Sequence, residues 1–171
     1  MLFGALPGYS QGDAVREYQI KAAFLFNFTQ FVEWPDYSLP EATAPLVIGV
    51  LGEDPFGNYL HKIVSTEKVN DHPLIIQHYD NAEEIKACHI LFINVSEPGK
   101  LKETIAALKG RSILTVSDDR EFIEDGGMIR FITKNNKIKI RINDVSAKEA
   151  GLTISAKLLS VAEVVHQKII N

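Results

Sequence analysis

Two pairs of acidic residues stand where an α/β protein could hold a metal ion. Glu53 and Asp54 follow one apolar run, and Asp118 and Asp119 follow another. The carboxyl ends of parallel strands meet at one edge of a sheet, so these carboxylates could converge on Mg²⁺, which prefers oxygen ligands. Each pair also precedes a segment expected to be helical, where carboxylates cap free N–H groups and complement the helix dipole. We favour the capping interpretation.

The segment from Gly49 to Gly57 is a glycine-bearing turn between an expected strand and an expected helix. Dinucleotide-binding folds place G-x-G-x-x-G there, so that backbone N–H groups contact pyrophosphate. The glycine spacing here differs, and the carboxylates of Glu53 and Asp54 would repel phosphate. The turn therefore does not predict a nucleotide site.

The remaining reactive side chains form no catalytic pattern. The five histidines, at 61, 72, 78, 89 and 166, show no His-x₃-His pairing, and Ser155 and Ser160 lack the nucleophile-elbow context. The single cysteine, Cys88, excludes an internal disulfide, and its apolar neighbours predict a buried free thiol. We predict no catalytic residue, no metal and no cofactor, and we expect the protein not to be an enzyme.

Composition indicates one ordinary globular domain. The chain has 171 residues, of which 46% are hydrophobic, and a net charge of −4 with both signs dispersed. Without a basic patch, nucleic acid is not an expected partner. No segment reaches the roughly 18 apolar residues of a membrane span, so we expect no direct membrane insertion. Residues 1–13 are interpreted as a disordered lead or the remnant of a secretory signal, and 14–171 as a single domain.

Apolar runs and helical segments alternate along the chain. Strands are expected at 46–51, 74–79, 89–94 and 112–116, and helices at 13–32, about 55–65, 80–87, 98–108 and 120–124. This alternation predicts a three-layer α/β/α domain with a mostly parallel sheet of about four strands. Segments 128–132 and 138–142 flank a polar reversal and predict an antiparallel hairpin at the edge of that sheet.

The first helix is apolar on most of its surface. Ile20, Phe24, Phe28 and Phe31 fall on one stripe, and further apolar residues lie on the other sides. Such a helix is either deeply packed or has one face that meets a second subunit or a partner. Trp34, the only tryptophan, is followed by proline, which should end the helix.

Several segments resemble the YfiR/HmsC family of small periplasmic regulators. The matching segments are 20–25, 31–35, 108–116, 127–131, 140–143 and 150–155 with Leu158 and Leu159. The resemblance implies a non-enzymatic, exported protein that restrains a membrane-bound partner, typically a diguanylate cyclase. Some family members carry paired cysteines and are discussed as redox-responsive. Because this chain has one cysteine, that property is not carried over.

Two binding functions stay open at this point. In the first, the protein binds and represses the sensory domain of a membrane diguanylate cyclase, with Phe31, Trp34, Arg141 and Asp144 as the expected partner-binding residues and a homodimer as a further possibility. Aromatic and arginine side chains are frequent interface anchors. In the second, the protein is a small-ligand sensor that uses a cleft at the carboxyl edge of the sheet.

Overall fold

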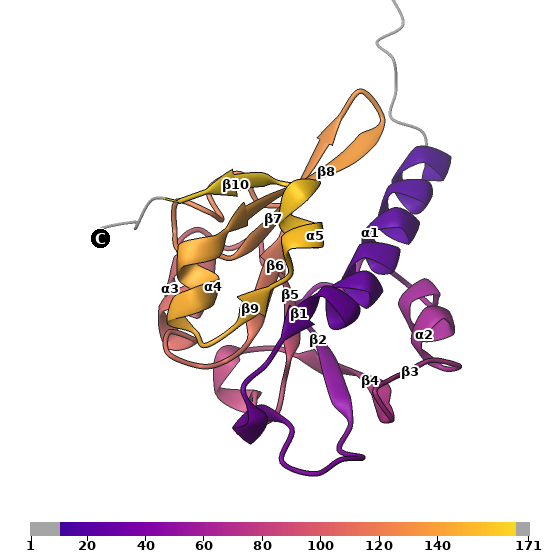
Figure 1. The fold of residues 1–171 in the computed structure, drawn as a ribbon. Coiled ribbons are helices and arrows are strands. Elements are labelled where there is room, and N and C mark those ends of the chain that lie inside the picture. Colours follow the sequence, from indigo (N-terminus) through magenta and orange to yellow (C-terminus); the bar gives the residue numbers. More distant parts are fainter. Residues whose placement is uncertain (1–10, 167–171) are drawn as a thin grey trace, which may run out of the picture.

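The computed structural model describes residues 11–166, and Figure 1 shows its elements. An eight-stranded sheet runs in the order β10-β8-β7-β6-β5-β2-β4-β3. Its strands are β2 (Leu46–Gly52), β3 (Lys68–Val69), β4 (His72–Tyr79), β5 (Ile90–Asn94), β6 (Leu114–Ser117), β7 (Ile129–Lys134), β8 (Lys137–Asn143) and β10 (Glu163–Val165). A separate two-stranded sheet joins β1 (Val32–Glu33) to β9 (Thr153–Ile154). The helices are α1 (Gln11–Phe31), α2 (Tyr59–Val64), α3 (Lys100–Ala107), α4 (Asp144–Glu149) and α5 (Ala156–Ser160), with 3₁₀ turns at η1 (Asp36–Ser38) and η2 (Ala82–Glu84).

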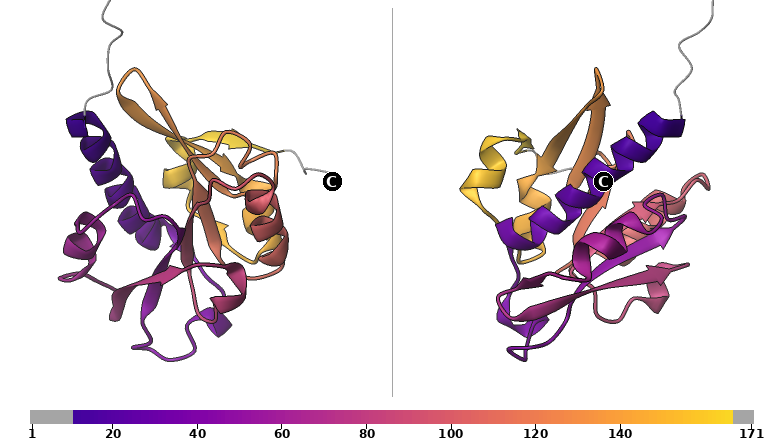
Figure 2. Two further views of the ribbon diagram at one scale, coloured as in Figure 1. Left: turned by 180° about the vertical axis from the view of Figure 1, so that it is seen from behind. Right: turned by 90° about the vertical axis from the view of Figure 1, so that its right-hand side faces the viewer.

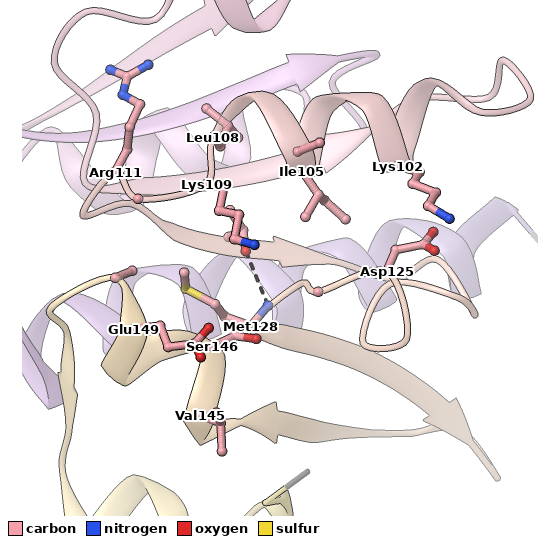
Figure 3. A pocket seen from close by; sticks show the side chains of 15 residues that line it. Lys102, Ile105, Leu108, Lys109, Arg111, Asp125, Met128, Val145, Ser146 and Glu149 are labelled. Atoms are coloured by element: carbon pink, nitrogen blue, oxygen red, sulfur yellow. Dashed lines mark hydrogen bonds between the residues drawn. The ribbon is translucent and has the colours of Figure 1, made fainter. Parts of the chain in front are cut away.

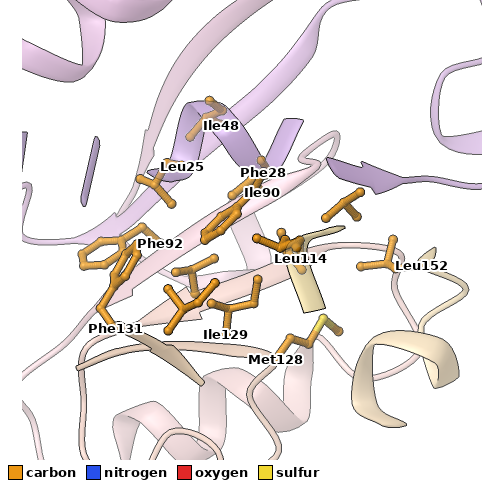
Figure 4. Close-up of a cluster of buried hydrophobic side chains, with 14 of the residues drawn as sticks. Leu25, Phe28, Ile48, Ile90, Phe92, Leu114, Met128, Ile129, Phe131 and Leu152 are labelled. Atoms are coloured by element: carbon orange, nitrogen blue, oxygen red, sulfur yellow. The ribbon is translucent and has the colours of Figure 1, made fainter. Parts of the chain in front are cut away.

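The predicted α/β class is confirmed. The expected strands form the parallel set β4-β2-β5-β6, and β7 and β8 form the antiparallel hairpin. Alternate residues of the central strand β5 pack on opposite faces of the sheet. Ile90 and Phe92 belong to the hydrophobic core beneath α1 and α2. Leu91 and Ile93 belong to a second core on the other face, beside α3. Figure 2 shows the sheet from behind and from the side, and Figure 4 shows the first core.

The sequence predicted the hairpin at the edge of the sheet, but the structure places one further strand outside it. The short strand β10 pairs with β8 in parallel, with Glu163 opposite Arg141, and so forms the outer edge. The prediction missed β10 because three residues are too short to show an alternating pattern. The hairpin turn itself is as expected: Asn135 and Asn136 have φ of 52° and 58°, the left-handed conformation of a tight two-residue turn.

The first helix packs with most of the predicted stripe. Phe28 is buried and Phe24 and Phe31 are partly buried against the core, whereas Ile20 is exposed. Ala22 and Leu25, which lie beside the stripe, are also buried. The helix ends at Phe31, and Val32 then enters strand β1, so the chain leaves the helix before Trp34-Pro35. Residues 11–13 belong to this helix; the rest of the expected lead, residues 1–10, lies outside the described residues.

Three expected helices are shorter or absent. The helix after β2 begins only at Tyr59, so Pro55 lies in the turn before it. The segment 80–87 forms only the 3₁₀ turn η2, capped by the side chain of Asn81, and 120–124 forms turns. Segments this short gain few backbone hydrogen bonds to offset helix nucleation. By contrast, Asn143 caps α4, because its side-chain oxygen accepts a hydrogen bond from the N–H of Ser146. Within residues 11–166, no helix combines the length and apolar character needed to cross a bilayer.

Candidate functional site

A cavity of about 470 Å³ lies between α3 and α4. Figure 3 shows Ile105 of α3 and Leu108, the residue after it, on one side and Ser146 and Glu149 of α4 on the other, with Met128 between them. The N–H of Met128 donates to the hydroxyl of Thr115, which also lines the cavity. The lining is a mostly apolar surface with charged groups around it, which is typical of small-molecule sites.

This cavity lies away from the carboxyl edge where the sequence predicted a ligand cleft. Its lining includes Arg111, which precedes β6, and Asp125 and Gly126, which precede β7. These residues mark the amino ends of the two strands. A smaller polar cleft of about 310 Å³ does lie at the carboxyl end of β6, where Asp118 is part of its lining.

The acidic residues at the carboxyl edge do not converge. Asp54 accepts a hydrogen bond from the Phe56 N–H at 2.7 Å and pairs with His78 Nε2 at 2.6 Å. Asp119 accepts from the N–H of Glu121 and so stabilises a turn where a helix was expected. Within residues 11–166, no group of three or more His, Cys, Asp or Glu side chains is arranged to hold a metal ion. The capping interpretation accounts for Asp54 and Asp119, with turns in place of helices.

Asp118 instead belongs to a partly buried ion-pair network around Lys21 that the sequence analysis missed. Lys21 of α1 is only 2% exposed, and its Nζ lies 2.9 Å from Asp118 Oδ2 and 2.7 Å from Glu17 Oε1. The hydroxyl of Tyr18 donates to Asp118 Oδ2 at 2.9 Å. The only feature of the sequence that could have indicated this network is the position of Lys21 inside the apolar stretch 20–25. The network ties α1 to the end of β6.

Cys88 and His89 lie at the amino end of β5. Burial raises the pKa of the Cys88 thiol to about 12, so it stays protonated. The Nδ1 atom of His89 accepts from the Val47 N–H at 2.9 Å, and its Nε2 lies 2.8 Å from the Ser38 carbonyl oxygen, to which it donates. These partners require the neutral imidazole, and burial lowers its pKa below the ordinary value. The expectation of a buried free cysteine is confirmed.

Two of the expected partner-binding residues lie at the end of α1. Trp34 is half-buried; its indole N–H donates to the His89 carbonyl oxygen at 3.0 Å, and its ring packs edge-on against the imidazole. Phe31 is also half-buried, and the Lys157 ammonium lies 5.5 Å from the centre of its ring. Both aromatic rings therefore keep part of their surface accessible while they anchor β1.

Of the other two expected residues, Arg141 lies on strand β8 of the hairpin and Asp144 is the first residue of α4. Arg141 pairs with Glu163 of β10 at 3.0 Å. Asp144 is 5% exposed, and its carboxylate pairs with Lys148 at 2.6 Å. Among residues 11–166, no hydrogen bond or ion pair joins Phe31 or Trp34 to these two residues.

The chain belongs to the YfiR/HmsC-like family. The sequence profile of that family matches residues 18–163, from α1 to the first residue of β10. The match includes every residue that lines the larger cavity. A search of curated proteins found no match.

Proposed function

We propose that this protein is a non-enzymatic periplasmic regulator that binds the sensory domain of a membrane-bound diguanylate cyclase and represses it. The observation that supports this function is membership of the YfiR/HmsC-like family over most of the chain. Repression of such an enzyme lowers cyclic-di-GMP and limits biofilm formation. In this role the protein needs a surface for its partner and no catalytic group.

Repression has an energetic requirement. A regulator shifts its partner toward the inactive state only by the difference between its affinities for the inactive and active states. About 3 kcal/mol of differential affinity shifts a 1:1 mixture beyond 100:1, since tenfold corresponds to about 1.4 kcal/mol. That amount is within the reach of two or three well-packed side chains at an interface.

Phe31 and Trp34 are the proposed apolar anchors of the interface, and Arg141 is its proposed charged contact. Both aromatic rings are half-buried, so they present rigid surface at a low entropy cost. Asp144 is the fourth proposed residue; it is 5% exposed, so its proposed role is to hold the exposed ammonium of Lys148, with which it pairs at 2.6 Å. The same apolar group is the proposed contact if the protein forms a homodimer.

The function is tested in the organism that produces the protein. Deletion of the gene should raise cellular cyclic-di-GMP several-fold, and a second deletion of the repressed cyclase should remove that rise. The purified protein should then bind the sensory domain of that cyclase in calorimetry. Unchanged cyclic-di-GMP after the first deletion would argue against the proposal.

The contact surface is tested with Trp34→Ala and Arg141→Glu, each checked for folding by circular dichroism. Tyr37→Ala is the matched control, because Tyr37 is a neighbouring aromatic residue that is 73% exposed. Folded variants that bind as tightly as the parent would place the interface elsewhere. A Trp34→Ala protein that unfolds would make Trp34 a core residue.

The proposed compartment has its own test. The gene with its natural upstream codons should direct the protein across the inner membrane. Cell fractionation that recovers the protein only from the cytoplasm would contradict the proposal.

The cavity between α3 and α4 favours a second candidate function, the sensing of a small molecule. Its volume of about 470 Å³ and its apolar residues Ile105, Leu108 and Met128 suit a ligand with an apolar body. Native mass spectrometry of the gently purified protein should detect a retained ligand. Ser146→Phe, which fills the cavity, should abolish retention, whereas the surface variant Lys62→Ala should not.

A further inference from the structure

Two arginines lie directly opposite each other on the hairpin. The register of β7 and β8 pairs Arg130 with Arg141, and on the outer side β10 places Glu163 opposite Arg141. Directly opposed residues of an antiparallel pair project from the same face of the sheet, with Cβ atoms about 5 Å apart. Like charges in such positions destabilise the pair.

The guanidinium groups of these arginines are poorly satisfied. The Nε atoms of Arg130 and Arg141 are both buried and have no hydrogen-bond acceptor. Within residues 11–166, no ion pair involves Arg130 at all, and Arg141 has only Glu163, whose side chain is 63% exposed. A buried N–H without an acceptor is costly, and more so when the group is charged. Among the described residues, the two guanidinium groups therefore have one carboxylate between them, that of Glu163 on Arg141.

The surroundings of Arg130 add positive charge. It lines the polar cleft of about 310 Å³ together with Lys21 and Arg120. The cleft also contains Glu17 and Asp118, but Lys21 lies between these two carboxylates and pairs with both. One lysine and two arginines thus face two carboxylates, which leaves the cleft with a net positive charge.

The geometry points to a carboxylate-binding site at Arg130 and Arg141, and we propose that its occupant is an acidic segment of the regulated sensory domain. This inference rests on the proposed regulatory function and names the chemistry of the partner surface. Guanidinium groups bind carboxylates through paired, parallel hydrogen bonds. The carboxylate of Glu163 beside Arg141 disfavours a multiply charged phosphate ligand. It tolerates the single charge of an Asp or Glu side chain.

Glu163 has a defined part in this site. It is the acidic residue of the chain's own edge strand, and it occupies one side of Arg141 when the partner is absent. An ion pair this exposed is weak. A carboxylate of the partner competes with Glu163 for Arg141 and meets no competitor among residues 11–166 at Arg130. The site is therefore half-filled in the isolated protein.

The test measures affinity for the sensory domain of the repressed cyclase by calorimetry at low and moderate NaCl. Arg130→Gln and Arg141→Gln should each weaken binding about tenfold or more, as expected when a desolvated charged contact is truncated. They should also reduce the dependence of affinity on salt. Lys139→Gln is the matched control: it removes the same charge from the same strand but lies at an exposed position nearer the turn. Glu163→Gln should act in the opposite direction and tighten binding, because it removes the competitor.

Thermal unfolding of the isolated variants separates binding from a structural role. Arg130→Gln relieves the repulsion between the arginines, so its melting temperature should equal or exceed that of the parent. Parent-like affinity for both arginine variants, or a clear fall in melting temperature for Arg130→Gln, would overturn the carboxylate site. If the parent protein itself fails to bind the sensory domain, the proposed regulatory function fails instead.

Discussion

Lys21 of α1 and Asp118 after β6 form an ion pair of 2.9 Å across 97 positions of sequence. Lysine side chains are almost never fully buried unless they are paired. The pair fixes the first helix against the carboxyl end of a central strand. It also explains why two acidic residues of the cleft are not available as metal ligands.

Replacement of Lys21 should destabilise the fold strongly. Lys21→Met keeps the apolar stem but leaves Glu17 and Asp118 facing each other without a cation. We expect a loss of about 3 kcal/mol in the free energy of unfolding, the size typical of a broken buried pair, measured by urea denaturation. Lys62→Met on the exposed side of α2 is the control and should change stability little. A loss below about 1 kcal/mol would show that the network contributes no more than a surface pair.

Stability should fall as the pH drops below about 6.5, the ordinary pKa of histidine. Burial lowers the pKa of His89 in the folded state, so the unfolded chain binds the proton first as pH falls. Its stabilising contribution is present above the unfolded pKa and is lost as pH falls toward the folded pKa. Urea denaturation at several pH values should show this slope. His89→Gln should flatten the slope, whereas His61→Gln, at an exposed position, should keep it.

Cys88 should be unreactive in the native protein. Its thiol is 7% exposed, donates to the Ile90 carbonyl oxygen at 3.2 Å and has a pKa raised to about 12 by burial. The nucleophilic species is the thiolate, so native protein at pH 8 should label with a maleimide far more slowly than protein unfolded in urea. Rapid labelling of the native protein would indicate that this part of the sheet opens.

The glycines of the turn after β2 should differ in their tolerance of alanine. Gly52 has φ of 89°, and a methyl group there would overlap the carbonyl oxygen of Asn94. Gly57 has φ of 57° with open space around it. Gly57→Ala should lower the free energy of unfolding by about 1 to 2 kcal/mol, the ordinary penalty for a side chain in the left-handed conformation. Gly52→Ala should lower the free energy of unfolding clearly more. Equal losses in thermal unfolding would show that the turn after β2 can move away from Asn94.

The parts of the fold that follow from local patterns could be predicted, and those that depend on distant partners could not. The apolar runs that became β2 and β5 are buried on both faces, which the composition of each run indicates by itself. Strand β10 and the β1–β9 pair have no such pattern, because each is a two- or three-residue bridge formed by the packing around it.

Some features of the candidate site could also be predicted from local sequence, and others could not. The opposition of Arg130 and Arg141 was accessible from the sequence, since a two-residue turn at Asn135 and Asn136 fixes the register of the hairpin. The burial of Lys21 was not accessible, because its partner Asp118 comes from another layer of the fold. The cavity between α3 and α4 also depends on how two helices separated by three strands approach each other.

The two outer strands of the large sheet, β3 and β10, contain two and three residues. A long exposed edge presents a row of free backbone N–H and C=O groups, which invites pairing with another chain and aggregation. Here β3 pairs only with His72 and Pro73 of β4, so among residues 11–166 the outer edge of β4 from Leu74 to Tyr79 has no strand partner. This part of β4 is the place where the sheet could accept a strand from another chain. Self-association through the sheet is therefore expected at the outer edge of β4.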